Sequence, residues 1–151
     1  MSHAGSHAGR VRARRCAVQA LYQWIVAGTP PTTIVQEFVA DRELIKVDMG
    51  YFTELTAEIP ARFDTLIAAI EPKIDRTWLQ VDTVERAILL IGTYELHFCP
   101  QLPWRVVLNE AVELCKMFGA EDGHRYINGV LDKIARDARC EEITGSPTLS
   151  I

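Results

Sequence analysis

Four arginines stand close together near the start of the chain, and phosphate binding is the chemistry that they suit best. They lie in the stretch GRVRARRCAVQALYQW, ahead of the first acidic residue: Arg10, Arg12, Arg14 and Arg15. A guanidinium group presents a planar fork of donors that matches two phosphate oxygens at once. Positive charge in the first turn of a helix opposes the helix dipole, at roughly 0.3–1 kcal/mol per charge, so helix stability does not account for the cluster. A solvated, frayed helix end is the alternative interpretation.

A second group near the other end of the chain combines a cation, an aromatic ring and an amide. The stretch GHRYING holds Arg125, Tyr126 and Asn128 at the start of the last predicted helix. Arg125 and Asn128 are predicted to point outward, with Tyr126 at the edge of the buried stripe. Recognition of single-stranded RNA needs such a ring for stacking and polar groups beside it to read the base edge. This group alone is a weak signal, and its weight comes from the arginines at the other end.

The remaining reactive side chains do not form a catalytic or metal-binding pattern. The sequence has no glycine-rich phosphate loop, no GxSxG or HExxH motif and no DxD cluster. His97 and His124 lack metal-ligand companions, and a solvated helix face explains Glu110 and Glu113. The scattered cysteines favour reduced, mostly buried thiols: Cys16, Cys99, Cys115 and Cys140. We therefore predict a protein that is not an enzyme and that uses no metal or cofactor.

Composition indicates one globular domain with two kinds of partner. The 151 residues are 48% hydrophobic, enough to bury a core. The formal net charge is −4, yet residues 1–16 sum to +4 and the rest to −8, which indicates a basic end and an acidic body. No apolar run reaches membrane-helix length and no secretory leader opens the chain, so we expect a cytoplasmic protein. The opening MSHAGSHAG is expected to be a disordered tail.

Helical periodicity recurs along the chain, and strand signals do not. We predict helices over about 11–26, 33–41, 48–70, 83–98, 104–118 and 123–139, with Pro60 kinking or splitting the third. Asp82 and Asp122 are the expected N-caps of the helices that follow them. Residues 88–91 are apolar all round, which is typical of a helix enclosed by others. The fold class is therefore all-α, with six or seven short helices around a central one.

Three stretches resemble the NusB family of bacterial transcription antitermination factors. They are RRCAVQALYQW, VERAILLIGTYEL and LNEAVELCKMFGAEDGHRYINGVLDKIA, and the resemblance spans about residues 10–139. It implies two packed helical bundles within one domain over 10–139, with subdomains of about 10–80 and 81–139. Residues 1–9 and 140–151 lie outside it and are expected to be flexible.

The resemblance also implies a function. NusB proteins pair with the ribosomal protein that doubles as NusE, and the pair binds the boxA element of ribosomal RNA operon transcripts. With other Nus factors they help RNA polymerase to pass premature, Rho-dependent terminators. A homodimer is left open as an alternative state.

Particular residues take roles from this resemblance. The arginines at 10, 12, 14 and 15 correspond to the RNA-binding arm of the family, and Asp122, Arg125 and Tyr126 match its second RNA-contacting region. Tyr22 and Glu85 match positions on the NusE-facing surface, where an acidic side chain suits a basic ribosomal protein. Val11 interrupts the arginine run, and Arg15 stands where an acid is common. These departures keep the arm basic but change its contacts.

Two rival functions come from other classes. NusB-like domains also occur fused to ribosomal RNA cytosine methyltransferases, but we expect no methyl transfer here because the chain has no room for a cofactor-binding sheet. The second rival is a helical adaptor that binds proteins and not RNA. Salt dependence separates the adaptor from an RNA-binding protein, because contacts to about four phosphates of a single strand give a log–log slope near −3.

Overall fold

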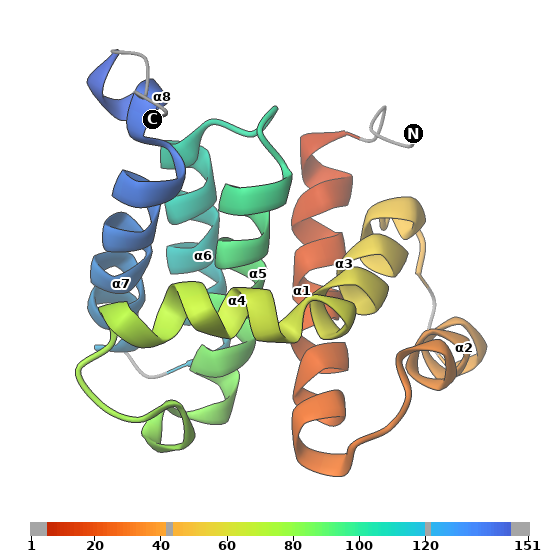
Figure 1. Cartoon of the computed structure of the whole chain (residues 1–151). Helices are drawn as coiled ribbons and strands as arrows, with labels where there is room; N and C mark the ends of the chain where they lie inside the picture. The colour runs from red at the N-terminus through yellow and green to blue at the C-terminus, as the bar shows by residue number, and fades with distance from the viewer. Residues whose placement is uncertain (1–5, 42–43, 120–121, 146–151) are drawn as a thin grey trace. The chain divides into compact units, whose positions relative to one another are not determined.

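The computed structural model describes residues 6–41, 44–119 and 122–145, and this part of the chain contains helices and no strand. The fold is all-α, as predicted, with eight α-helices among these residues. The chain forms two compact units that divide between Phe63 and Asp64. Figure 1 traces both units along the chain.

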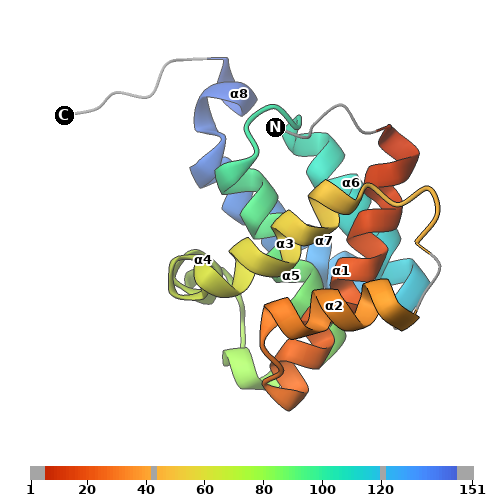
Figure 2. The same cartoon turned by 90° about the vertical axis from the view of Figure 1, so that its right-hand side faces the viewer.

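The first unit is a group of three helices in mutual contact. They are α1 (His7–Ala27), α2 (Pro31–Asp41) and α3 (Met49–Ala61), and Figure 2 shows them from a second side. Small residues on α1, Ala13 and Ala17, are fully buried and let the neighbouring helices approach closely. The rings of Phe38 and Phe52, 5.2 Å apart, join α2 to α3. Gly28 ends α1 in the left-handed conformation, at φ 69°.

Helix α1 begins at His7, four residues before the predicted start at Val11. Ser6 caps it, because the Ser6 hydroxyl accepts a hydrogen bond from the Gly9 N–H at 3.0 Å. The Gly9 carbonyl accepts another from the Asp48 N–H, at 3.1 Å, which ties the start of α1 to the start of α3. The expectation of a disordered tail is therefore wrong for residues 6–9, while residues 1–5 lie outside the described residues.

The third predicted helix is split into two. Pro60 lies in the last turn of α3, and the helix ends at Ala61 because Arg62 leaves the helical conformation. The next helix, α4 (Phe63–Ile70), is followed by two 3₁₀ turns, η1 (Glu71–Lys73) and η2 (Trp78–Gln80). Of the two outcomes left open for Pro60, the structure has the split.

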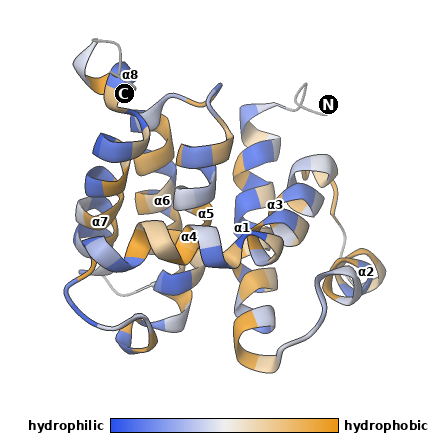
Figure 3. Cartoon of the chain, viewed as in Figure 1, coloured by the Kyte–Doolittle hydropathy of each residue, from blue (hydrophilic) through white to orange (hydrophobic). Residues whose placement is uncertain are grey.

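The second unit is built on α5 (Thr83–Phe98), α6 (Trp104–Phe118) and α7 (Gly123–Ala138), which pack pairwise against one another. All residues from Ala87 to Leu96 are buried in α5, which confirms the enclosed helix predicted from residues 88–91. Gly92 permits the close contact with α7, since a Cβ there would lie 2.7 Å from Leu131 Cδ1. In Figure 3 hydrophilic and hydrophobic residues alternate along α7, as in a helix with one buried face.

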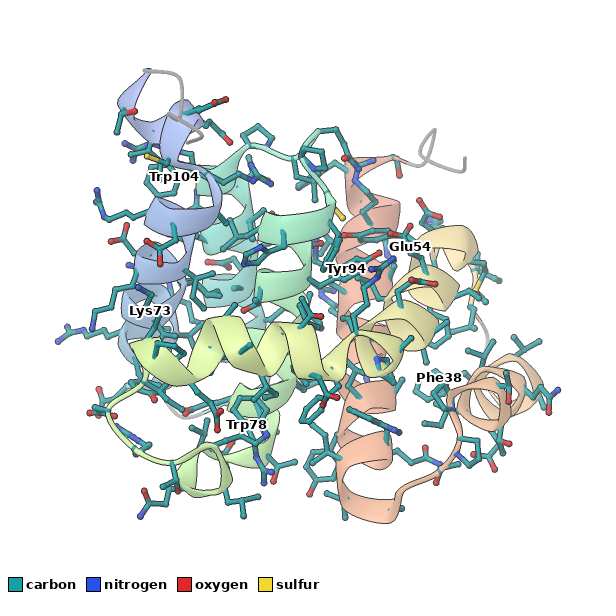
Figure 4. The ribbon with its side chains drawn as sticks, viewed as in Figure 1. Phe38, Glu54, Lys73, Trp78, Tyr94 and Trp104 are labelled. Atoms are coloured by element: carbon teal, nitrogen blue, oxygen red, sulfur yellow. The ribbon has the colours of Figure 1, made fainter. Side chains whose placement is uncertain are left out.

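The predicted boundary between subdomains, at about residue 80, does not coincide with the observed division after Phe63. The segment between α4 and α5 belongs with the later helices because η1 packs against α7. Lys73 Nζ lies 2.8 Å from Asp137 Oδ2 and makes an ion pair across this contact. Figure 4 labels Lys73 beside α7.

One of the two predicted N-caps is confirmed. The Asp82 carboxylate accepts hydrogen bonds from the N–H groups of Val84 and Glu85, at 3.1 and 3.4 Å. Asp122 occupies the N-cap position of α7 in a helical conformation, and its side chain makes no capping hydrogen bond. A cap needs an extended backbone so that the side chain can reach back, which Asp122 lacks.

The end of the second unit is held by a buried arginine. Arg139, 7% exposed, donates hydrogen bonds to the carbonyls of Glu95, Leu96, Cys99 and Leu102 and to Glu142 Oε1. Glu142 Oε2 accepts from the Trp104 N–H at 2.9 Å and so caps α6. We call Arg139 and Glu142 the C-terminal clamp. Residues 140–145, predicted to be flexible, instead form α8 (Cys140–Thr144) and its C-cap Gly145, while 146–151 lie outside the described residues.

Among the residues that the structure describes, no helix combines the length and apolar character needed to cross a membrane.

Candidate nucleic-acid interface

The outer face of α1 carries the most accessible of the four arginines. Arg15 is exposed and Arg12 is half-buried, and their spacing of three residues puts them on one helix face. Arg10 is half-buried one turn before Arg14. Because α1 begins at His7, only Arg10 lies in its first turn. The dipole cost predicted for the whole cluster therefore falls mainly on Arg10, since the effect fades beyond the first turn.

Arg14 does not share this outer face. Its side chain is 1% exposed, and its guanidinium carbon lies 5.6 Å from the centroid of the Tyr51 ring on α3. Arg14, Val18 and Leu21 lie on the buried side of α1 with Ala13 and Ala17. Arg14, predicted with the other three arginines as part of an RNA-binding arm, thus packs between helices as a cation–π partner and does not present its side chain to solvent.

In the second unit, Tyr126 is half-buried and is covered on one face by an arginine. The guanidinium carbon of Arg76 lies 4.2 Å from the centroid of the Tyr126 ring. Arg76 is held in turn by Asp75, whose Oδ1 accepts from Arg76 Nε at 2.7 Å. Burial raises the pKa of Tyr126, and the nearby Arg76 charge partly opposes that shift. The Arg76 guanidinium therefore makes a cation–π contact with the Tyr126 ring.

A basic pocket of about 240 Å³ opens beside this ring. Three of its lining side chains carry positive charge and one carries negative charge, namely Lys73, Arg125, Lys133 and Asp75. Gly129 lines the same pocket, and a Cβ at that position would meet nothing within 4 Å. The pocket thus exposes helix backbone between cations, which suits an anionic ligand with a flat part.

The other two predicted contact residues of this region are placed differently. Asn128 is exposed but lines a separate pocket with Asn109, between α6 and α7. Asp122 is exposed just before α7. The structure thus brings Arg125 and Tyr126 together in one pocket, and Asn128 lines another.

Glu85 lies against the start of α7. A Cβ at Gly123 would collide with Glu85 Oε2 and come within 3.0 Å of Cys115 Sγ, so the bare glycine allows α7 to approach both side chains. Burial raises the pKa of Glu85, the Asp82 carboxylate adds to the shift, and Arg76 opposes it. The pKa of the buried Cys115 thiol is raised by burial and by Glu85. Glu85 is thus a half-buried carboxylate close to Arg76.

Tyr22 lies on α1 and is 44% exposed, and Val26, one turn later, is 61% exposed. This adjacent pair forms a small apolar patch on the first unit. Single exposed apolar residues are common on protein surfaces. Tyr22 and Val26 indicate a binding surface because they are neighbours on the helix, and because tyrosine is enriched at protein interfaces.

Sequence reasoning missed the three cations around Tyr126: Lys73, Arg76 and Lys133. Lys73 and Arg76 lie in the connector between α4 and α5, roughly 50 residues before the ring, and no local pattern links them to it. Lys133 lies two helical turns after Tyr126 on the same helix face, a spacing from which it could have been found. No group of three or more His, Cys, Asp or Glu in the described ranges could hold a metal ion.

A model of the NusB family matches residues 11–136. The chain belongs to the NusB family. The matched range includes α1 with Arg12 and Arg15, and α7 with Arg125 and Tyr126, and it ends before the C-terminal clamp.

Curated NusB proteins are similar to this chain over most of their length. The transcription antitermination protein NusB of Thiobacillus denitrificans is 45% identical over 131 residues, covering 87% of this chain and 90% of the relative. NusB of Nitrosococcus oceani is 47% identical over 133 residues, covering 88% and 89%. A solved structure of T. maritima NusB covers 89% of this chain and 96% of its own, with a TM-score of 0.65 and 24% identity. That likeness confirms the NusB fold.

Proposed function

We propose that this protein is a transcription antitermination factor that binds the boxA element of ribosomal RNA operon transcripts as a heterodimer with the ribosomal protein NusE. In this role it acts by binding, without catalysis, in the cytoplasm. Together with other Nus factors it helps RNA polymerase to suppress premature, Rho-dependent termination. The observation that carries the proposal is membership of the NusB family over residues 11–136.

Cations on each unit support the RNA-binding part of the proposal. On α1, Arg12 and Arg15 share an accessible face. On the second unit, Arg125 and Lys133 line a pocket beside the half-buried Tyr126 ring. Such a set supplies phosphate-binding forks and a stacking plane, which are the two requirements for holding an unpaired strand. The net charge of the whole chain is −4, so these cations are locally concentrated and are not part of a generally basic surface.

Two residues support the partner-binding part, one on each unit. Tyr22 offers an exposed ring beside Val26, and Glu85 offers a half-buried carboxylate. The residues after position 16 carry a net charge of −8, and this negative charge attracts a basic ribosomal protein. A homodimer through the same surfaces is the competing assembly.

The decisive experiment is fluorescence anisotropy of a labelled boxA RNA titrated with the full chain, with and without NusE, at two or more salt concentrations. We expect NusE to tighten binding, and the affinity to fall with added salt as phosphate contacts require. Binding of NusE without any binding of RNA would instead support the adaptor function. A scrambled RNA of equal length controls for non-specific attraction.

Substitution of Tyr126 tests the stacking role. Tyr126→Ala is expected to weaken RNA binding by roughly 1–3 kcal/mol, the usual contribution of a stacked base. Tyr126→Phe is the matched control, because the buried Tyr126 hydroxyl has no hydrogen-bond partner among the described residues. It should retain RNA affinity and the melting temperature. If Tyr126→Ala lowers the melting temperature while RNA affinity stays the same, the ring serves only the core.

Substitution of Glu85 tests the partner surface. Because burial raises the pKa of Glu85, its ionisation opposes folding, and the stability it contributes is greatest at low pH and declines as the pH rises through its folded-state pKa. Glu85→Gln should therefore not lower the melting temperature at neutral pH. It should weaken NusE binding measured by calorimetry, and Glu85→Lys should weaken it further by like-charge repulsion. Unchanged calorimetric affinity for both variants would place NusE elsewhere.

A further inference from the structure

A second pocket, of about 210 Å³, lies between α6 and α7 on a different face of α7 from the Tyr126 pocket. Helix α6 lines it with Trp104, Arg105, Leu108 and Asn109, and α7 lines it with Asn128 and Asp132. In Figure 4 Trp104 is labelled near the point where α7 passes into α8. None of the roles proposed above uses this pocket as a whole.

Its walls combine an aromatic plane with amide groups. The Arg105 guanidinium carbon lies 4.6 Å from the centroid of the Trp104 ring. Asn109 and Asn128 are exposed side chains, one on each helix. A carboxamide both donates and accepts hydrogen bonds, and it matches the paired donor and acceptor on one edge of adenine. Leu108, 6% exposed, contributes an apolar surface.

The charges in the pocket do not oppose an anionic strand. Asp132 Oδ2 accepts a hydrogen bond from Arg136 Nε at 3.0 Å, so this carboxylate is already compensated. Arg105 adds a positive charge that a phosphate can approach. The volume lies below the 300–1,000 Å³ typical of drug-sized ligands, which suits a single planar ring system.

Helix geometry connects this pocket to the Tyr126 pocket. Asn128 and Asp132 lie three and seven residues after Arg125, so the three side chains follow one ridge of α7. Arg125 also lines the Tyr126 pocket, and it therefore stands between the two pockets. A strand that leaves Tyr126 would pass a phosphate-binding side chain before it reaches Asn128.

We propose that the pocket between α6 and α7 binds one unpaired purine base, preferentially adenine, of an RNA strand that crosses α7 over Arg125. The base stacks on Trp104, and the carboxamides of Asn109 and Asn128 hydrogen-bond to its edge. This inference rests on the proposed RNA-binding function. It extends the bound RNA beyond the Tyr126 pocket by at least one nucleotide.

The test uses the full chain and labelled RNAs that carry boxA with several extra nucleotides on both sides. Each flanking nucleotide in turn is replaced by an abasic one. In the wild-type protein, we expect one flanking position whose abasic form weakens binding roughly tenfold, with a pyrimidine there weaker than adenine. In the Asn109→Ala, Asn128→Ala double variant, the same abasic replacement should have a smaller effect and adenine should lose its advantage over a pyrimidine, because only stacking on Trp104 remains. Glu113→Gln, an exposed position of α6 outside the pocket, should behave as the wild type.

The outcomes distinguish this proposal from the one on which it rests. If no flanking position depends on Asn109 and Asn128 while binding still depends on Arg12 and Arg15, the base pocket is refuted and the proposed function stands. If the wild type binds none of the RNAs, both fail. NMR signals of the Trp104 indole and of the Asn109 and Asn128 side-chain amides test whether a protein occupies the pocket in place of RNA. Signals that shift with NusE but not with RNA would make the pocket a protein contact and overturn the proposal.

Discussion

Arg139→Ala should lower the free energy of unfolding by about 3–5 kcal/mol, the range seen when a buried, hydrogen-bonded charge network loses one partner. Arg139 donates to four backbone carbonyls and to Glu142, and three of those carbonyls belong to the end of α5 or its C-cap. Without the guanidinium, the carbonyls of Leu96 and Leu102 must recruit water or stay unpaired. Those of Glu95 and Cys99 lose their second donor and keep hydrogen bonds from the Cys99 and Leu102 N–H groups. Thermal unfolding followed by circular dichroism should show a loss of roughly 10 °C or more.

Arg136→Ala is the matched control, since it removes the same type of side chain from the last turn of α7, three residues before Arg139. Arg136 pairs with Asp132 at the surface, with 60% of the arginine side chain exposed, and such a pair is worth less than about 1 kcal/mol. Arg139→Lys should recover only part of the loss, because an ammonium has three donors where the guanidinium has five. Equal melting temperatures for Arg136→Ala and Arg139→Ala would refute the clamp.

The C-terminal clamp also predicts how the stability of the second unit changes at low pH. Burial acts to raise the pKa of Glu142, but hydrogen bonds from the Trp104 N–H and from Arg139 outweigh it and hold the pKa below its usual range. The stability from this carboxylate is present above the unfolded-state pKa and is lost as the pH falls through the folded-state value. Arg139→Ala should therefore flatten the acid limb of a plot of stability against pH.

Sequence reasoning predicted the helices because they carry long periodic apolar stripes and clear stop signals. The bounds of α5 and α6 were predicted to the residue, since Asp82 caps the one, Pro103 precedes the other and Gly119 ends it. The start of α1 was missed because its stabilising contacts come from a serine cap and from Asp48, far along the chain. The residues at 6–9 carry no periodic apolar signal of their own.

The sequence predicts only part of the candidate interface, because some of its contacts join segments that are far apart in the chain. Helical spacing alone could have separated Arg14 from its neighbours, because it lies on the same stripe as Ala17, Val18 and Leu21. The same spacing places Arg12 and Arg15 away from that stripe, on the opposite face. The stacking of Arg76 on Tyr126 had no such signal, since it is a tertiary contact between a connector and a helix. The sequence pattern of a helix shows on which face each side chain lies. The packing between helices determines which of these faces contact one another.

Removing Arg12 and Arg15 together should produce the largest loss of RNA affinity. If each guanidinium makes one charge-assisted contact worth about 1.5 kcal/mol, Arg12→Ala with Arg15→Ala should weaken boxA binding roughly 100-fold at low salt. The log–log salt slope should fall by about 1.4, at roughly 0.7 per lost phosphate contact on a single strand. Anisotropy titrations at several salt concentrations measure both quantities.

Two controls separate charge from structure in this experiment. Arg62→Ala removes an exposed arginine of the first unit, paired with Glu58 at 3.1 Å, and should leave the slope unchanged. Arg14→Met removes the buried cation beside Tyr51, so it should lower the melting temperature with little change in slope. The Arg12 and Arg15 variant should keep its helicity, because neither side chain is buried. A slope that falls as much for Arg14→Met as for that variant would mean that the helix as a whole, and not its outer face, determines RNA binding.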